Sequence, residues 1–321
     1  MKSRIAAALA ALAIATGAAA AQDWPTKTVR IIVPFGAGST PDVVARLLAD
    51  NMQKKLGQTF VVENKPGGGG NIGTDVVAKA APDGSTIGIS IGGPLAINTL
   101  LFSKLPYNPG KDIAAVTQLI TQPSALAVNA DLGVNNVAQL IALLKKDPGK
   151  YNFASIGNGS LSHLAMAAIA QKSGTTITHI PYASSPQAMT AVVRGDAQMA
   201  AMPAIAVLPQ AKAGKVKMLA VSTPKRSPYL PDVPTLKESG IDVEADAWMG
   251  LIAPGGTPPA VIEKINAAVV EALQDPAIKQ KLATQLMEPV GNSPQEFRAK
   301  IDAEIGRWAA VIKAAGIKPI N

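Results

Sequence analysis

The chain has 321 residues, of which 48% are hydrophobic and 16% charged, and its formal net charge is +8. It contains no cysteine, which excludes disulfides, thiolate metal sites and a cysteine nucleophile. For the same reason we expect no lipid anchor on an N-terminal cysteine. Its basic residues are scattered, without the basic stripe and interleaved aromatic side chains typical of nucleic-acid binding. With two histidines in all, a histidine-rich metal site is excluded, and we expect neither a metal nor a cofactor.

Residues 1–21 have the pattern of a secretory signal peptide. Lys2 and Arg4 precede an apolar run over residues 5–15, and small residues follow it up to Ala21. The run is too short and too rich in alanine to be a membrane span. We therefore expect an exported, freely diffusing protein, which in a bacterium with two membranes means the periplasm.

The rest of the chain alternates predicted strands with predicted helices. Apolar, β-branched segments predict strands over 29–35, 60–63, 86–90, 152–155, 176–180, 197–202, 217–222 and 247–252, with one or two more within 116–128. Apolar periodicity and end signals predict helices over 41–55, 72–80, 137–146, 186–194 and 205–213, one from the SIGNGS loop to about 172, one after GGPL, and two long ones beginning near 257 and 293. Thr40 is the predicted N-cap of the first helix. This alternation predicts an α/β fold with largely parallel sheets.

The length of the chain predicts two domains. About 300 residues remain after the signal peptide, more than one ordinary hydrophobic core organises. We place residues 22–121 together with 224–321 in one lobe and residues 122–223 in the other. The proline-rich segment at 223–235 is then a crossing or a surface excursion between them.

Three glycine-rich loops lead from a predicted strand into a predicted helix: FGAGST at 35–40, SIGGPL at 90–95 and SIGNGS at 155–160. The first turn of a helix has unpaired N–H groups and a partial positive charge, and glycines let an anion approach them. A tight turn without a ligand is the alternative for any single loop, but three such loops favour an anion-binding cleft. The candidate ligand-binding residues in these loops are Phe35, Gly36, Gly38, Ser39, Thr40, Asp42, Gly92, Gly93, Ser155, Gly157, Asn158, Gly159, Ser160 and His163.

Other chemistries fit less well. The PGGGGN loop at 66–71 lacks the G-K-[ST] ending of a phosphate-binding loop, which argues against a nucleotide. Ser160 and His163 lie three residues apart on a predicted helix, not on a strained nucleophile elbow, so a secreted hydrolase is only the alternative function. We interpret His163 as a capping or pocket-wall residue, and Asp42 as a helix-stabilising acid that also bonds loop amides. Trp248 is a candidate wall of the cleft.

The chain resembles the extracytoplasmic solute receptors of tripartite tricarboxylate transporters, the Bug family, over essentially its whole mature length. The resemblance rests on motifs such as WPTKTVRIIVPFGAGSTPDVVARLLA, VVENKPGGGGNIGTDVVAKAAPDGSTI, HIPYASSPQAMTAVVRGDAQ and WMGLIAPGGTPPAVIEKIN. It implies a two-lobed periplasmic binding protein fold of type II, with two Rossmann-like lobes and a small carboxylate between them. It also implies a monomer that delivers this ligand to membrane transporter subunits; a receptor serving a sensor kinase is the other possibility.

The resemblance further implies that the loop at Phe35–Asp42 grips one carboxylate, and that the loop at Ser155–Ser160, backed by His163, forms the opposite wall. The chain departs from the family at two places. Ser39 replaces a usual glycine, and the segment Ala201–Pro203 lacks an aspartate that many relatives carry there. The missing aspartate favours a dicarboxylate or an aromatic carboxylate over an amino acid, with Pro203 on the less polar wall. We expect Ser39→Ala or Ser160→Ala to weaken binding by about 1 kcal/mol or more.

Overall fold

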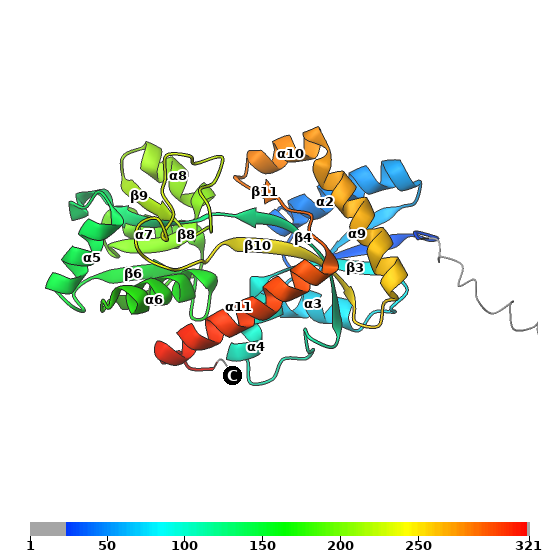
Figure 1. The fold of residues 1–321 in the computed structure, drawn as a ribbon, viewed down its shortest axis with the longest axis horizontal. Helices are drawn as coiled ribbons and strands as arrows, with labels where there is room; N and C mark the ends of the chain where they lie inside the picture. The colour runs from blue at the N-terminus through cyan, green and yellow to red at the C-terminus, as the bar shows by residue number, and fades with distance from the viewer. Residues whose placement is uncertain (1–23, 320–321) are drawn as a thin grey trace, which may run out of the picture.

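The structure is a computed structural model that describes residues 24–319, so the predicted signal peptide lies outside the described residues. Figure 1 shows two lobes lying side by side, with chain segments crossing between them and the C-terminal helix running along both. We call the lobe with the six-stranded sheet lobe 1 and the lobe with the five-stranded sheet lobe 2. No helix within residues 24–319 is long and apolar enough to cross a membrane.

Lobe 1 is built on a sheet of order β11-β4-β10-β3-β1-β2. Its strands are β1 (Val29–Val33), β2 (Phe60–Asn64), β3 (Thr86–Ile91), β4 (Ile113–Gln122), β10 (Ala247–Pro254) and β11 (Glu288–Pro289). β1 pairs in parallel with β2 and β3, as the strand–helix alternation predicts, whereas β10 runs antiparallel to both β3 and β4. The sheet is therefore mixed, because β10 does not follow β3 through a crossover helix but enters from lobe 2.

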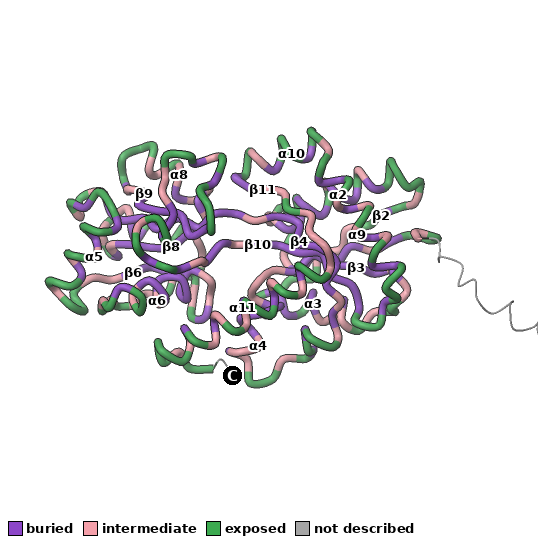
Figure 2. Tube along the Cα trace, viewed as in Figure 1, coloured by how far each residue is buried: buried purple, intermediate pink, exposed green. Residues whose placement is uncertain are grey.

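Helices cover both faces of this sheet. On one face lie α2 (Thr40–Leu56), α9 (Pro259–Gln274) and α10 (Pro276–Ala283), which share an apolar core with the strands. On the other lie α3 (Asn71–Ala78) and the start of α11 (Pro294–Ala314). The short helix α4 (Asn98–Leu101) follows the loop after β3. Figure 2 shows the buried residues concentrated along the strands of both lobes and the helix faces turned toward them.

Lobe 2 is built on a sheet of order β7-β6-β8-β5-β9. Its strands are β5 (Ser124–Asn129), β6 (Asn152–Ser155), β7 (Thr178–Pro181), β8 (Met199–Pro203) and β9 (Val216–Val221). One face packs on α5 (Val137–Lys146) and α6 (Leu161–Ser173), and the other on α7 (Ser185–Arg194) and α8 (Ala204–Lys212). β6 is parallel to β7 and β8, while β5 is antiparallel to both β8 and β9.

Two segments carry the chain between the lobes. β4 ends at Gln122 and β5 begins at Ser124, so the first crossing falls at Pro123, which has no N–H to donate to a strand ladder. The chain returns between β9 and β10, over residues 222–246. Within this return, Leu230 and Leu236 are buried in the cores of lobe 2. The predicted lobe boundary at 223/224 stays a prediction, and this packing favours a return crossing nearer residues 244–246.

The helix α11 ties the lobes together. Its first half packs Phe297 against Gly250 of β10 so closely that a Cβ at position 250 would lie 1.9 Å from the phenyl ring, which explains the glycine. Its second half places Trp308 and Val311 in the core that includes Leu164 of α6. One apolar helix face thus serves two lobes.

The structure corrects three local predictions. Ser39, not Thr40, is the extended N-cap residue of α2, and its side chain makes no capping hydrogen bond. The region after α9 contains the unpredicted helix α10, which begins where Asp275 leaves the helical conformation and accepts the N–H of Ala277. The predicted helix after Gly92 opens with a π-helical turn over Gly93–Ile97 before α4 begins.

Candidate ligand-binding cavity

A cavity of about 460 Å³ lies between the two lobes and takes its walls from both. The predicted site residues that line it are Phe35, Gly92, Gly93, Asn158, Gly159, Ser160, Pro203 and Trp248. The predicted site residues that are not among its lining residues are Gly36, Gly38, Ser39, Thr40, Asp42, Ser155, Gly157 and His163. This division separates residues that face the cavity from residues that shape the loops behind it.

The loop before α6 presents the end of a helix to the cavity. Ser160 is the N-cap: its Oγ accepts the N–H of His163 at 3.3 Å and donates to the carbonyl of Gly157 at 2.7 Å. Leu161 and Ser162 occupy the first two helical positions, whose N–H groups have no acceptor inside a helix, and both residues line the cavity. The positive end of the α6 dipole therefore meets the cavity, which suits a bound anion.

Three stacked rings support this loop from behind. The imidazoles of His163 and His179 lie 3.9 Å apart at 8° to one another, and Phe153 stacks on His179 at 4.9 Å. The N–H of Gly159 donates to His163 Nδ1 at 3.1 Å, so that nitrogen is an unprotonated acceptor. His179 Nε2 bonds the hydroxyl of Ser155 at 2.5 Å. His163 and Ser155 thus hold the loop in place without lining the cavity.

The electrostatics of this stack favour neutral rings. Burial lowers the pKa of His163. Burial, together with the neighbouring His163 ring, lowers the pKa of His179 to about 4. Because two charged imidazoles would repel each other at this separation, protonation of both rings would destabilise the stack and the loop that it supports.

The loop before α2 is organised around a buried carboxylate instead. Asp42 is 3% exposed, and it accepts hydrogen bonds from the N–H of Gly38 and the side chain of Asn64, both at 2.9 Å. Arg46 adds two more at 3.0 and 2.9 Å, and this guanidinium is the largest reason why the pKa of Asp42 is lowered to about 2. The predicted bond from Asp42 to a loop amide is confirmed. The carboxylate has no free side to offer a ligand.

The contribution of this first loop to the cavity is therefore narrow. Phe35, which precedes the glycines, and Pro41, which lies two residues after the N-cap, line the cavity. Ser39 Oγ is buried and has no hydrogen-bond partner among the described residues. The sequence predicts that this loop and the loop before α6 contact the ligand in the same way. In the structure, the loop before α6 lines the cavity with three of the predicted residues, whereas the loop before α2 lines it with only Phe35 among them.

Much of the cavity wall consists of residues that sequence reasoning missed. Most of them are apolar: Ile91, Ile97, Leu101, Phe102, Ile156, Leu161, Ala201, Ala247 and Met249. Asn98, at the start of α4, lines the cavity while its amide donates to Asn71 Oδ1 at 2.6 Å. Gly69, from the PGGGGN loop, also lies on the wall. Only the glycines gave a local signal, because apolar wall residues look like core residues in a sequence.

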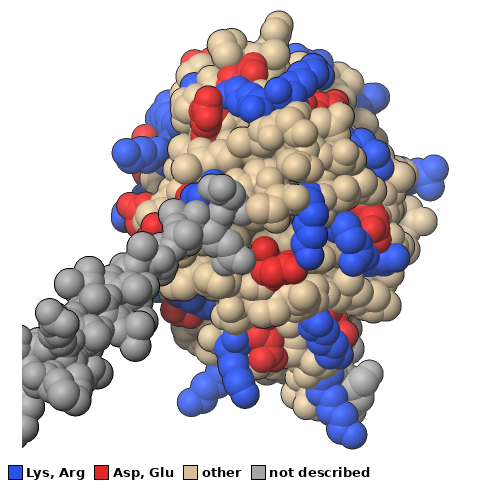
Figure 3. Space-filling view, turned by 90° about the vertical axis from the view of Figure 1, so that its right-hand side faces the viewer, with Lys and Arg blue, Asp and Glu red and all other residues tan. Residues whose placement is uncertain are grey.

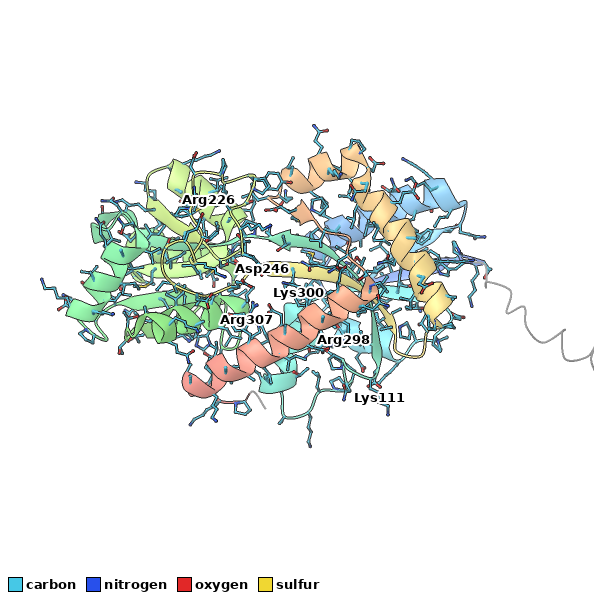
Figure 4. All side chains as sticks on the ribbon, viewed as in Figure 1. Lys111, Arg226, Asp246, Arg298, Lys300 and Arg307 are labelled. Carbon is cyan, nitrogen blue, oxygen red and sulfur yellow. The ribbon has the colours of Figure 1, made fainter. Side chains whose placement is uncertain are left out.

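Sequence reasoning also missed two acidic residues that line the cavity near the junction of the two lobes. Asp246, just before β10, accepts the hydroxyl of Thr121 at 2.6 Å and faces Lys300 at 3.5 Å. Figure 4 shows Asp246 and Lys300 near the junction of the two lobes, with Lys300 on α11. The side chain of Asp246 is 4% exposed, so this ion pair is largely screened from solvent.

The second acid is Glu304 on α11. It is 3% exposed, and its two oxygens accept Arg307 at 2.9 Å and the indole N–H of Trp308 at 2.6 Å. Burial raises the pKa of Glu304, although Arg307 opposes that shift. Of the charged side chains in the described part of the chain, only Asp246 and Glu304 line the cavity. An anionic ligand must therefore be held by backbone N–H groups, hydroxyls and helix ends.

Within residues 24–319, no group of three or more histidine, aspartate or glutamate side chains could hold a metal ion. The face of the molecule in Figure 3 carries lysines and arginines interspersed with acids rather than one continuous basic patch.

Two α/β lobes around a shared cavity, joined by two crossings and one bridging helix, are the architecture of the type II periplasmic binding protein fold. The model of the tripartite tricarboxylate transporter family receptor matches residues 44–317, and the chain belongs to this family. It is 37% identical over 302 residues to BugT of Bordetella pertussis, which covers 93% of this chain and 92% of that protein. The Bug family consists of periplasmic solute receptors, not enzymes, so the hydrolase alternative is excluded.

Solved structures agree with this assignment. An R. palustris protein with adipate matches at a TM-score of 0.79 and 35% identity, over 93% of this chain and 100% of that one. MatC from Rhodopseudomonas palustris, with bound malate, matches at a TM-score of 0.73 and 32% identity, over 90% and 100% of the two chains. The predicted fold class is confirmed.

Proposed function

We propose that this receptor binds a small carboxylate in the cavity between its lobes and delivers it to a membrane transporter of the tripartite tricarboxylate type. The observation that carries the proposal is the start of α6, where Leu161 and Ser162 line the cavity and their N–H groups have no acceptor inside the helix. Phe35 and the Gly92–Gly93 turn of lobe 1 form other parts of its wall. A carboxylate at this helix end would be held without any neighbouring cation.

The remainder of the wall specifies the body of the ligand. Side chains such as Ile97, Phe102 and Trp248 make it apolar, which fits a methylene chain or an aromatic ring. We therefore infer that the ligand is a dicarboxylate or an aromatic carboxylate. The related proteins solved with adipate and malate support a carboxylate of this size.

Binding and closure are linked in this proposal. A ligand that contacts both lobes stabilises the conformation in which the lobes approach, and the membrane partner would recognise that conformation. A few charge-assisted hydrogen bonds, less the cost of closure and desolvation, give a binding free energy of about −8 kcal/mol, which corresponds to a micromolar ligand.

The test is a thermal-shift screen of the mature protein against mono-, di- and tricarboxylates, aromatic acids and amino acids, with titration calorimetry of each hit. Ile156 is 41% exposed and lines the cavity, so Ile156→Glu should abolish binding by placing a negative charge there. Ile72 is 52% exposed and is not a lining residue, so Ile72→Glu is the matched control. A protein that no carboxylate stabilises would contradict the proposal.

Delivery needs a separate test. We expect cells that lack this receptor to lose uptake of the ligand identified in the screen, and Ile156→Glu to fail to restore it where Ile72→Glu succeeds. Unchanged uptake, combined with loss of a transcriptional response to the same ligand, would instead favour a receptor that serves a sensor kinase.

A further inference from the structure

Asp246 presents a free acceptor atom at the cavity. The residue lines the cavity and is only 5% exposed. One carboxylate oxygen, Oδ2, accepts the hydroxyl of Thr121 and faces Lys300. Among residues 24–319, no group donates a hydrogen bond to the other oxygen, Oδ1. Oδ1 is not fully buried, so it is open on the cavity side and can accept a hydrogen bond from a ligand.

The groups around Asp246 do not offer a ligand any positive charge. Lys300 is on the Oδ2 side of the carboxylate, with its ammonium 5.8 Å from the ring centre of Trp248, and it does not line the cavity. Glu304, the other acid on the wall, has both oxygens occupied by Arg307 and Trp308. Where Asp246 lines the cavity, the ligand therefore meets a hydrogen-bond acceptor and not a cation.

Among residues 24–319, lobe 2 contributes no second carboxylate to the cavity wall. Ala201 and Pro203 line the cavity with apolar groups, in the segment where the sequence lacks the aspartate of many relatives. Asp246 comes from a different part of the chain, just before β10, and supplies a carboxylate to the same cavity. Asp246 can therefore accept a hydrogen bond from a donor group of the ligand, even though the aspartate of many relatives is missing from residues 201–203.

We propose that Asp246 selects carboxylates whose far end carries a hydrogen-bond donor. This inference rests on the proposed function, the binding of a small carboxylate in the cavity, and it replaces the expectation of a dicarboxylate that is ionised at both ends. The preferred ligands are carboxylates with a hydroxyl or an ammonium group at the far end, and a dicarboxylate binds with its second carboxyl group protonated. A donor would form a charge-assisted hydrogen bond to Oδ1, whereas an ionised second carboxylate would leave two anions in contact without a proton between them.

The experiment compares length-matched probes at about pH 8, where a free carboxyl group with an ordinary pKa near 4 is ionised. One set is adipate, 6-hydroxyhexanoate and 6-aminohexanoate, and a shorter set is succinate, 4-hydroxybutyrate and 4-aminobutyrate. Calorimetry on the wild-type protein should show a donor-ended probe binding about tenfold or more tightly than the dicarboxylate of the same length, as one charge-assisted hydrogen bond would give. Comparison of the hydroxyl and ammonium probes then identifies which donor is preferred.

Asp246→Asn should reverse this order. The asparagine amide can donate to a carboxylate, its oxygen can still accept from Thr121, and Lys300 loses its counter-charge, so the dicarboxylate should gain about tenfold relative to the donor-ended probes. Asp242→Asn is the matched control, because Asp242 lies in the same segment, is exposed and does not line the cavity. That variant should keep the wild-type order.

The outcomes separate this inference from the proposed function. If the wild-type protein binds the dicarboxylate most tightly, the inference is overturned, whether or not the variant folds. An unchanged order of affinities in a folded Asp246→Asn protein would overturn it as well. If no carboxylate of any length binds, the proposed function itself fails.

Discussion

The loops before α2 and α6 share one sequence pattern, in which a strand leads through glycines and a serine into a helix, but they do different work. The loop before α6 turns Asn158, Gly159 and Ser160 toward the cavity and is supported by a neutral histidine stack. The loop before α2 is organised around the buried carboxylate of Asp42, and of its described residues only Phe35 and Pro41 reach the cavity. A shared sequence pattern therefore predicts a shared backbone turn. Whether the turn contacts the ligand depends on how the surrounding elements pack against it.

Removing the carboxylate at the centre of the first loop should have the largest effect. Asp42→Ala leaves the N–H of Gly38, the amide of Asn64 and the guanidinium of Arg46 without their acceptor, and we expect a loss of about 3 kcal/mol in the free energy of unfolding. Urea denaturation measures this loss. Asp302→Ala breaks an exposed i,i+4 pair with Arg298 and should cost less than about 0.5 kcal/mol. Equal losses in the two variants would show that Asp42 does not organise its loop.

The two loops should lose their contributions to stability at different pH values as the solution is acidified. The histidines have lowered pKa values in the folded protein, about 4 for His179, so the unfolded chain binds more protons below about pH 6.5. Their contribution is complete above about pH 6.5 and is lost as the pH falls toward 4; with allowance for solvent screening it amounts to about 1–2 kcal/mol. Asp42, with a pKa of about 2 against an ordinary 3.8, keeps its contribution down to pH 3.8 and loses it only below.

Urea titrations of the wild type and of His179→Phe across this pH range measure the histidine contribution. The phenyl ring preserves the stack but cannot be protonated, so the difference in stability between the two proteins should vary with pH between about 6.5 and 4. A difference that is independent of pH would mean that the stack does not control the acid sensitivity of the loop.

The N-cap of α6 should matter less than the acid at the first loop but should affect binding directly. Ser160→Ala removes the acceptor for His163 N–H at a cost of about 1 kcal/mol in stability, and should weaken carboxylate binding by about 1 kcal/mol. Ser184 caps α7 in the same lobe and does not line the cavity. Calorimetry with the screened ligand should therefore find normal affinity for Ser184→Ala, and equal weakening in both variants would count against a special role for Ser160.

Ser39→Ala should have the smallest effect. Ser39 Oγ has no hydrogen-bond partner among the described residues and the residue does not line the cavity, so we expect changes below about 0.5 kcal/mol in both stability and affinity. The sequence predicts a larger loss, equal to that of Ser160→Ala. Thermal unfolding and calorimetry on Ser39→Ala and Ser160→Ala, measured side by side, show whether the two serines contribute equally to stability and to affinity.

Local chemistry made much of the fold predictable. The capping-box spacing of Ser293 and Glu296 marks the start of α11, and both reciprocal hydrogen bonds of that box are present. Glycines after α2 and α6 mark their ends, and β-branched runs mark the strands. The helix α10 escaped prediction because its eight residues, the first of which is Pro276, give too weak a periodic signal.

The candidate site was predictable only in part. Glycine loops have a local signature, which is how Gly92 and Asn158 were found. Asp246 and Glu304 have none, because an acid on a cavity wall and an acid on a solvated surface have the same neighbours in the sequence. What placed them was the return of the chain from lobe 2 and the position of α11 across both lobes.

The sequence by itself determined the class of this protein and the order of most of its strands and helices, since family motifs, caps and apolar periodicity all act over short stretches of chain. Tertiary structure alone decided that β10 runs antiparallel beside β3 and β4 and that Asp246 meets the cavity. These arrangements depend on contacts between residues more than a hundred positions apart, such as Thr121 with Asp246. A pairing over that separation is fixed by the burial of whole sheets and helices, and no local pattern records it.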